Sequence, residues 1–416
     1  MKIYFIWYLI PVVLLAMPLF WLVLRNERKR LLFLLLLSFG VLSLLHIIFA
    51  LAALGLIVIA HQIVAANKAG RLTAGRALLL SIIIAVATLG IGKYGRHGVV
   101  AIWGNSDWVV SHFIMPLGIS YFVFRLLQYV FDHLRGVLDD NSFLKLATFV
   151  MFIPTFPAGP LETYQGFYSK HSQEFDRNLF YTGLRRIAFG YFQKVFIVSF
   201  LFDAVIVGII PVALNQPHFT WNTIHPLWPL VYVISNFVRA YFDLSAYTDL
   251  AMGFSSLFGF RIMENFDKPF WKKNLSDFWR CWHISLSSWC RDNVYFPVSG
   301  LTRKPWLAIY ASMLTMGLWH NISINWTLWG VYHGTGIIVV LGWSSHKKAL
   351  RKARKKAGKP PAPTYERFTG WLGYPATFFY VALGYAFVSM DTAQSGLEVF
   401  YLCIRGPIVF IINVLR

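Results

Sequence analysis

The chain alternates long apolar runs with short polar connections, a pattern typical of a membrane protein with many helices. A spanning helix needs roughly 20 predominantly apolar residues. We expect such segments at 3–24, 31–48, 49–66, 77–94, 111–131, 143–157, 181–211, 226–246, 305–319, 322–343, 368–389 and 395–415, with a short helix near 247–260. The pattern predicts an all-α integral membrane protein with about 11 to 13 transmembrane or re-entrant helices.

The composition agrees with this class. Of the 416 residues, 57% are hydrophobic and only 13% are charged, so a soluble fold has too little interior for the apolar side chains. The formal net charge of +20 would also suit a nucleic-acid partner. The basic residues, however, lie in short connections between apolar segments, as in cytoplasmic loops of membrane proteins. We therefore expect the lipid bilayer, and no nucleic acid, as a partner.

The same basic connections predict the orientation of the chain. Placing the connections at 25–30, 68–76 and 347–359 on the cytoplasmic side leaves the N-terminus outside. The connection 391–398, "DTAQSGLE", has no Lys or Arg and suits the outer side, which puts the C-terminus in the cytoplasm. Segment 3–24 has no small-residue cleavage pattern, so we expect it to be retained as a helix.

The stretch 265–306 is too charged to span a membrane and too aromatic for a solvated loop. Large apolar residues recur in it at helical spacing, namely Trp279, Trp282, Leu286 and Trp289. Polar residues occupy another face, namely Asp277, Arg280, Ser287 and Arg291. This spacing predicts an amphipathic or re-entrant helix, which at membrane depth requires protein or a water-filled cavity around its polar side.

A second irregular stretch, "FIPTFPAGPLETY", interrupts an apolar run with Pro154, Pro157 and Pro160. Proline removes backbone donors from a helix, so this segment should be broken and packed against protein. Together the two stretches suggest an internal chamber. No repeat or soluble domain is evident, so we expect one membrane domain over residues 1–416, with a basic cytoplasmic loop at 344–367.

Three histidines fall where an ionisable group is costly, which makes them functional candidates. His283 lies on the predicted amphipathic helix, His320 ends the span 305–319, and His333 lies in the next span. For several other histidines a structural or surface role is expected, namely His46, His61, His218, His225 and His346.

The residue types limit the chemistry of these histidines. His320 and His333 are thirteen residues apart, on roughly opposite sides of a continuous helix, and no HExxH pattern is present, so no metal site is expected. Cys281, Cys290 and Cys403 have neither CxxC spacing nor a setting that would activate a thiol, and no GxSxG turn is present. General-base catalysis by a histidine on a hydroxyl needs none of these features.

Six ordered blocks resemble the membrane-bound O-acyltransferase family. They are "MPLGISYFVFR", "MFIPTFPAGP", "YFDLSAYTDLAMGFSSLFGFRIMENFDKPF", "DFWRCWHISLSSWCRD", "MGLWHN" and "WGVYHG". They cover most of the chain after about residue 115, and the resemblance implies a catalytic core at 115–343. It also implies helices around a funnel, with a thioester donor arriving from the cytoplasm and a hydroxyl acceptor outside.

The resemblance assigns roles to individual residues. His320 matches the catalytic histidine of the family, and His283 matches its functional companion. Residues expected to line the chamber or contact substrate are Trp282, Trp289, Trp319, Asn321, Arg291 and Arg125, although the tryptophans also suit chamber walls and the arginines also suit structural ion pairs. Asn321 stands where the family usually has glycine, so the turn after His320 is expected to differ.

Two bacterial branches of the family remain open. "MFIPTF", "NFDKPF" and "RKKAGKPPAP" look like the teichoic-acid D-alanylation branch, whereas "FGFRIMENF" and "RDNVYFPVSG" look like the alginate O-acetylases. The arm between Arg291 and Pro305 is shorter than in the first branch, where it helps to dock the carrier protein.

The function expected from the resemblance is transfer of an acyl group, D-alanyl in the first instance, to hydroxyls of an envelope polymer such as teichoic acid. The alternative is O-acetylation of an exopolysaccharide. The donor would be a thioester on a phosphopantetheine carrier protein or coenzyme A, with no permanently bound cofactor or metal. Expected partners are the cytoplasmic carrier protein, the extracytoplasmic polymer and other envelope-modification proteins at the bacterial cell membrane. A transporter of a lipid-linked intermediate and a non-catalytic scaffold remain as rivals from other classes.

Overall fold

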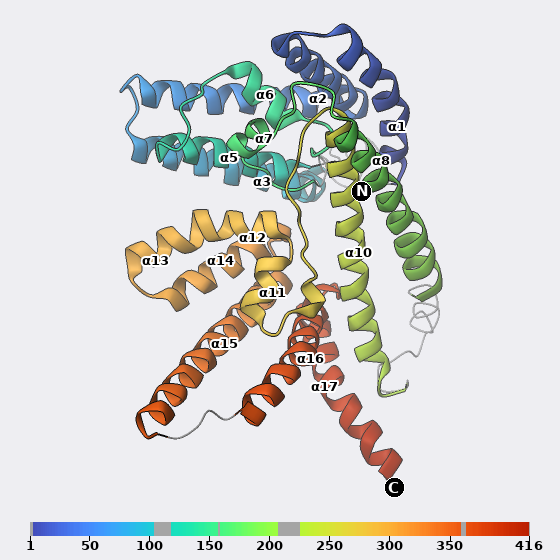
Figure 1. Cartoon of the computed structure of the whole chain (residues 1–416), viewed down its shortest axis with the longest axis vertical. Helices are drawn as coiled ribbons and strands as arrows, with labels where there is room; N and C mark the ends of the chain where they lie inside the picture. Colours follow the sequence, from blue (N-terminus) through green and yellow to red (C-terminus); the bar gives the residue numbers. More distant parts are fainter. Residues whose placement is uncertain (1–2, 104–117, 157–158, 207–224, 359–362, 416) are drawn as a thin grey trace. The chain divides into compact units, whose positions relative to one another are not determined.

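A computed structural model describes residues 3–103, 118–156, 159–206, 225–358 and 363–415 (Figure 1). Within these ranges the chain forms helices and no β-strand, apart from one isolated antiparallel bridge between Phe266 and Trp282. The predicted all-α class is confirmed. The chain divides into two compact units, Met1–Gly190 with Tyr247–Met263, and Tyr191–Ala246 with Glu264–Arg416.

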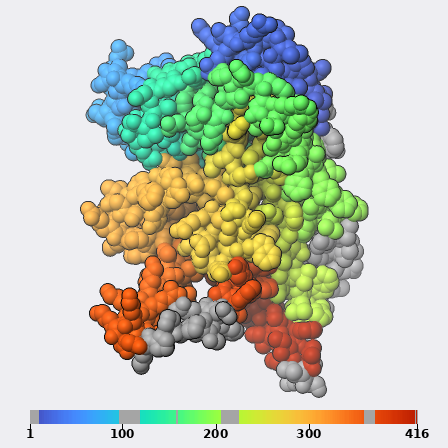
Figure 2. Space-filling view, in the orientation of Figure 1, coloured from blue at the N-terminus to red at the C-terminus, as the bar shows by residue number. Residues whose placement is uncertain are grey.

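The first unit holds the N-terminal helices and the proline-rich stretch. Its elements are α1 (Ile3–Pro18), η1 (Leu19–Val23), α2 (Glu27–Lys68), α3 (Ala74–Trp103), α5 (Ile119–Leu134), α6 (Phe143–Met151), α7 (Tyr164–Ser169), most of α8 (Arg177–Phe192) and the end of α10 (Trp228–Leu257). α2 packs against α6, and α3 against α5. In the space-filling view the segments from α2 to α7, coloured blue to green, form one continuous body (Figure 2).

The second unit holds the candidate site. Its elements are η2 (Gln193–Ile206), the first part of α10, η4 (Pro269–Trp271), α11 (Leu275–Cys281), α12 (Ile284–Cys290), η5 (Arg291–Tyr295), α13 (Phe296–Thr302), α14 (Pro305–His320), α15 (Ile324–Lys356), α16 (Pro363–Val388) and α17 (Ala393–Leu415). α14 and α15 form a closely packed hairpin, and α16 packs against both α15 and α17 (Figure 1).

Five segments of the described chain are long and apolar enough to cross a membrane. They are Glu27–Lys68, Ala74–Gly95, Arg177–Ala204, Gly370–Val388 and Ala393–Ile412. In each segment, only 17% to 33% of the most apolar 18 residues are buried inside the protein. This is expected for helices whose outer faces meet lipid. The membrane class is thus supported, while the total number of crossings and the funnel stay predictions.

One helix boundary expected in the sequence is wrong, and another lies close to where it was predicted. α2 consists of two helical segments that meet at a kink at His46, with φ −165° and ψ 97°, near the boundary expected between 31–48 and 49–66. Segments 226–246 and 247–260, in contrast, form the single helix α10, which ends before Gly259 at φ +83°.

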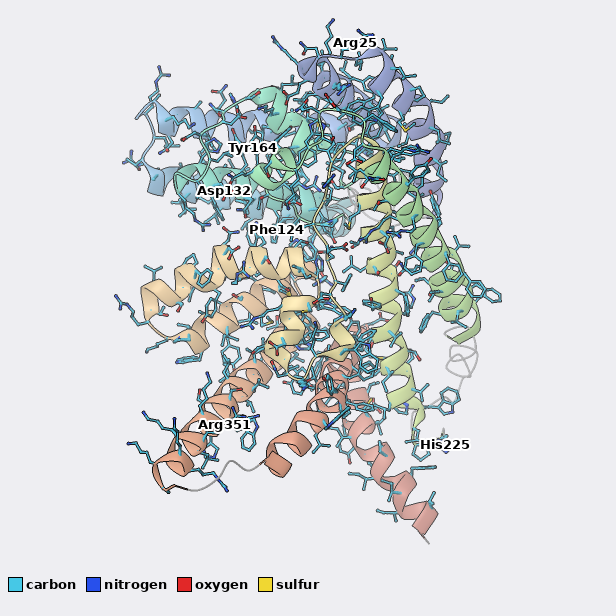
Figure 3. The ribbon with its side chains drawn as sticks, viewed as in Figure 1. Arg25, Phe124, Asp132, Tyr164, His225 and Arg351 are labelled. Atoms are coloured by element: carbon cyan, nitrogen blue, oxygen red, sulfur yellow. The ribbon has the colours of Figure 1, made fainter. Side chains whose placement is uncertain are left out.

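The basic stretch at 344–367 was expected to be a loop, but it is helical as far as Lys356. Lysine, arginine and alanine are strong helix formers, so α15 continues until Gly358 at φ +64°. Arg351 in this basic end is labelled in Figure 3.

The proline-rich stretch is broken as predicted. α6 ends at Met151, too early for the expected span 143–157, and Phe152, Ile153 and Phe156 behind it are buried. Several predicted features lie outside the described residues, namely 111–117 of one span, Pro157, His218 and 359–362 of the basic loop.

Candidate functional site

The α14–α15 hairpin places His320 at the end of α14. Two glycines let the helices approach closely, since small residues allow backbones to come together. A Cβ on Gly317 would lie 2.4 Å from the carbonyl oxygen of Trp326, and one on Gly330 would lie 2.9 Å from that of Met313. The end of α14 is therefore held directly against the first turns of α15.

His320 is exposed, yet it lies against aromatic rings on one side. Its imidazole stacks on the indole of Trp326 with centroids 4.4 Å apart and planes at 16°, and it meets Trp319 at 4.7 Å and 73°. The tryptophan surface fixes the plane of the imidazole and leaves the residue accessible. Trp326 was missed in the sequence, where its distance of six positions from His320 gave no sign of a contact across the turn.

Asn321 ends α14 in an extended conformation, with φ −159° and ψ 139°. Its amide donates to the carbonyl of Gly317 at 3.1 Å, and its own carbonyl accepts from the amide of Ser323 at 3.0 Å. Any residue adopts this backbone conformation. Asparagine in place of the family glycine therefore imposes no strain on the turn after His320.

The sequence predicted one amphipathic helix through His283, and this prediction is wrong. The helix is broken at Trp282 and His283, between α11 and α12, and His283 adopts a left-handed conformation with φ +45°. Backbone pairing with a distant segment replaces helical bonds here: the amide of Ile284 donates to the carbonyl of Asn265, and that of Asp267 to the carbonyl of Cys281. This non-local pairing has no signature in the local spacing of residues.

Asn265, for which the sequence suggested no role, anchors the start of α12. Its fully buried side-chain oxygen accepts from the hydroxyl of Ser285 at 2.7 Å and from the amide of Ser285 at 3.2 Å. With the backbone bond to Ile284, these contacts hold both residues that follow His283. Asn265 therefore fixes where the His283 side chain begins.

The His283 side chain is buried, with 3% of its surface exposed. Neither ring nitrogen hydrogen-bonds another residue in the described part of the chain. Burial lowers the pKa of His283 to about 4, against a smaller opposing effect of its own backbone. His283 lies outside the membrane-spanning segments, because α11 and α12 on either side of it have seven residues each, too few to span a membrane. At neutral pH the imidazole is neutral, with one nitrogen able to donate and the other to accept.

Trp319 joins the two histidines. The ring of His283 meets it edge-on at 6.1 Å and 81°, and His320 meets it at 4.7 Å. Two histidines 37 positions apart in the sequence thus contact one indole. Of the predicted site residues, the structure brings together His283, Trp319, His320 and Asn321.

Trp282 and Trp289 lie elsewhere in the same unit. Trp282 is stacked on Phe278 at 5.4 Å and 21° and packs beside Phe237 at 5.3 Å, within an aromatic cluster. Trp289 is buried at the end of α12, where its carbonyl accepts from the side-chain amide of Asn293 at 3.1 Å. Both residues are buried.

The two predicted arginines have structural partners. Arg291 is exposed and forms a two-bond pair with the neighbouring Asp292, at 2.8 and 3.0 Å. Arg125 belongs to the first unit, where its buried guanidinium donates to the carbonyls of Thr155 at 2.8 Å and Phe149 at 3.3 Å. The bond to Phe149 satisfies a carbonyl that the end of α6 leaves without a helical partner, and Thr155 lies in the broken stretch behind it.

His333, the third candidate, is fully buried on α15 between Trp279 at 5.1 Å and Trp329 at 4.6 Å. Trp329 also meets His320 at 6.3 Å, so it separates the two histidines. No group of three potential metal ligands occurs among the described residues. All three cysteines are free.

Comparisons with a family model and with individual known proteins agree on one family. The model of the membrane-bound O-acyltransferase family matches residues 23–383. A protein named "Probable alginate O-acetylase AlgI" from Pseudomonas syringae is 34% identical over 64% of this chain and 52% of its own length. The "Teichoic acid D-alanyltransferase" of Streptococcus thermophilus is 30% identical over 66% of this chain and 68% of its length. The chain spans about half the length of most of the alginate O-acetylases it matches.

Proposed function

Since the chain belongs to the membrane-bound O-acyltransferase family, we propose that it transfers an acyl group from a thioester to a hydroxyl of a cell-envelope polymer. The observation that carries this proposal is the meeting of His283 and His320, from separate elements, at Trp319. Acyl transfer to a hydroxyl needs a base for the hydroxyl proton and a donor for the developing oxyanion. Two histidines at one indole can supply both.

His320 is the general base in this proposal. As the acceptor oxygen bonds to the thioester carbonyl, the imidazole takes the hydroxyl proton, and a tetrahedral intermediate forms. When the intermediate collapses, the carbon–sulfur bond breaks, and the imidazolium returns the proton to the leaving thiolate. The products are an ester and a free thiol. The exposure of His320 gives both substrates access, and the stack on Trp326 suits the charged form of the ring.

His283 stabilises the oxyanion or positions a reactant. Its buried, neutral imidazole can donate one hydrogen bond to the carbonyl oxygen without carrying a proton away. A donor held rigidly by its backbone costs little reorganisation during the reaction. The anchoring of the following residues by Asn265 supplies that rigidity.

D-alanyl is the first acyl group we propose, with a teichoic-acid-type polymer as acceptor and a phosphopantetheine carrier protein as donor. Support comes from the D-alanyltransferases of Streptococcus thermophilus and Bacillus subtilis, of whose lengths the match covers 68% and 67%. The basic end of α15, which extends to Lys356, offers positive charge for an acidic carrier protein.

Acetyl is the second candidate, with an exopolysaccharide as acceptor. It is supported by the higher identity, 34%, to the alginate O-acetylase of Pseudomonas syringae. A "Peptidoglycan O-acetyltransferase" of Helicobacter pylori is also 28% identical over 77% of this chain. A small acyl group and a hydroxyl of an envelope polymer are common to both proposals.

We place this activity in the bacterial cell membrane, with the N-terminus outside, the C-terminus in the cytoplasm and the acceptor on the outer side. Other envelope-modification proteins would act with it. The rival from another class is a transporter of a lipid-linked intermediate, because broken helices and buried ionisable groups also mark transport sites.

The test uses the purified protein in liposomes with either a labelled D-alanyl carrier protein or a labelled acetyl thioester. Each donor is offered with teichoic acid or with a deacetylated polysaccharide. Transfer from one donor and not from the other identifies the acyl group. Movement of a lipid-linked polymer across the bilayer without any covalent transfer would contradict the acyltransferase and support the transporter.

A further inference from the structure

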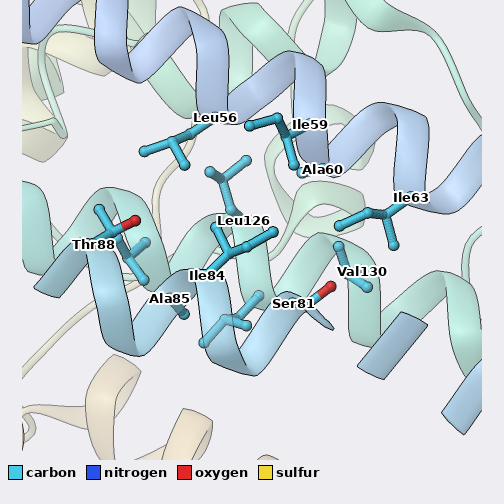
Figure 4. A pocket seen from close by; sticks show the side chains of 12 residues that line it. Leu56, Ile59, Ala60, Ile63, Ser81, Ile84, Ala85, Thr88, Leu126 and Val130 are labelled. Carbon is cyan, nitrogen blue, oxygen red and sulfur yellow. The ribbon is translucent and has the colours of Figure 1, made fainter. Parts of the chain in front are cut away.

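A groove runs between α2, α3 and α5 in the first unit (Figure 4). The empty space in it, part of which is open to the surroundings, is about 350 Å³. Its lining is aliphatic, with side chains such as Leu56, Ile63, Ala85 and Val130, apart from Ser81 and Thr88. The hydroxyl of Ser81 donates to the carbonyl of Ala77 at 2.8 Å, so its hydrogen is already used within α3.

Two of the helices that form this groove, α2 and α3, are the most apolar of the five candidate membrane spans. Only 28% of the most apolar 18-residue stretch is buried inside the protein in α2, and only 17% in α3. The outer faces of both helices are therefore expected to meet lipid. An empty groove there forfeits dispersion contacts, and water has few polar groups to bind in it. A flexible hydrocarbon chain from the surrounding bilayer regains those contacts.

Basic residues follow the lining residues along the helices at one end of the groove. Lys68, Arg76 and Arg135 each lie five residues beyond a lining residue, namely Ile63 on α2, Ser81 on α3 and Val130 on α5. Five residues of helix correspond to about 7.5 Å along the axis. All three side chains are exposed, and Arg71 in the turn between α2 and α3 adds a fourth positive charge.

The acidic groups near this end are largely occupied. Asp132, labelled in Figure 3, accepts from the side-chain amide of Gln128 at 2.7 Å, and Asp140 pairs with Lys145 at 3.1 Å. Lys68 donates to the backbone carbonyl of Asp139, not to its carboxylate. Positive charge therefore predominates at the polar end of an apolar groove.

We propose that this groove binds an anionic phospholipid, with one acyl chain between α2, α3 and α5 and the phosphate at Lys68, Arg76 and Arg135. The three helices end together, so one molecule meets both the apolar lining and the basic rim. Basic pockets between transmembrane helices recognise anionic headgroups in this way. The site shares no residue with the pair His283 and His320, and it would hold together the α2–α3–α5 helices.

The test is native mass spectrometry of the full chain after incubation with equal amounts of phosphatidylglycerol and phosphatidylcholine. We expect the wild type to retain phosphatidylglycerol over phosphatidylcholine by about tenfold or more. Ala85→Phe fills the groove and should abolish retention of either lipid. Ala87→Phe adds the same ring to the exposed face of α3 and should retain the lipid.

A second variant does not depend on packing in the groove. The double variant Arg76→Gln with Arg135→Gln should keep a bound lipid but lose the preference for phosphatidylglycerol. The control double variant on α15, Lys347→Gln with Lys348→Gln, should keep that preference. Equal retention in Ala85→Phe and Ala87→Phe would overturn the groove as the binding site. Binding without headgroup preference in the wild type would overturn the anionic lipid and leave a neutral one.

Discussion

The imidazole of His320 stacks on the indole of Trp326, with ring centroids 4.4 Å apart and planes at 16°. One residue ends α14 and the other lies in the first turns of α15, so the tight turn at Asn321 creates this contact. The stack does two things for a general base. It fixes the plane of the ring, and it favours the imidazolium that forms during the reaction.

Replacing Trp326 should therefore slow transfer without abolishing it. A cation–π contact of this kind corresponds to between about 2- and 30-fold in rate, so Trp326→Leu should lose activity in that range. Trp326→Phe should lose less, because an aromatic face remains. A looser stack occurs between the exposed residues His346 and Trp343, at 5.9 Å and 26°, and Trp343→Leu serves as the control. Equal rates in both leucine variants would remove the role of the stack.

The approach of α14 to α15 should be sensitive to one methyl group. A Cβ on Gly317 would lie 2.4 Å from the carbonyl oxygen of Trp326, so Gly317→Ala must push the helices apart and shift His320. We expect the free energy of unfolding to fall by about 1–3 kcal/mol, as is typical of overpacking, with a lower thermal midpoint and slower transfer. Gly342→Ala on α15 meets nothing within 4 Å and should change neither quantity.

Local pattern was sufficient for several of these features. The apolar run 305–319 predicted α14, with His320 directly behind it. Prolines predicted the break after α6. These features depend on residues close together in the sequence, so periodicity and breakers reveal them.

Features that rest on distant pairing were out of reach. The break at His283 depends on backbone bonds to residues 265–267, and Asn265 has no neighbour in the sequence that reveals its role. Trp326 becomes visible only once α14 and α15 are packed. Arg125 was expected either near substrate or in a structural ion pair; its guanidinium binds the carbonyls of Phe149, near the end of α6, and of Thr155, behind it.

Asn265 should matter for activity beyond its effect on stability. Asn265→Ala leaves the buried amide and hydroxyl of Ser285 without their acceptor, which costs about 1–3 kcal/mol in the free energy of unfolding. It should also slow transfer, because His283 loses its anchor. Asn274→Ala removes a cap of α11, where the side chain accepts from Asp277 at 2.9 Å, and costs about 1 kcal/mol. Transfer rates measured on folded protein should fall only in the first variant.

The stability of the protein should fall in mild acid because of His283. Its folded-state pKa is lowered from 6.5 to about 4 by burial, so the unfolded chain takes up the proton first. The stability is therefore intact above pH 6.5 and is lost progressively as the pH falls toward 4. His283→Asn tolerates the left-handed backbone and should show a smaller loss of thermal midpoint between pH 7.5 and 5. An unchanged pH dependence would show that His283 does not remain neutral in the folded state.

The most direct measurement is chemical rescue of His320→Ala. In a single-turnover transfer assay, loss of a general base should slow the reaction by about 100-fold or more, with the thermal midpoint retained. Because His320 is exposed, added imidazole should restore part of the rate, with a pH profile that follows free imidazole base. His346→Ala, at an exposed and similarly stacked histidine, should transfer at the wild-type rate and gain nothing from imidazole. Wild-type transfer by folded His320→Ala would contradict the assignment of His320 as the base.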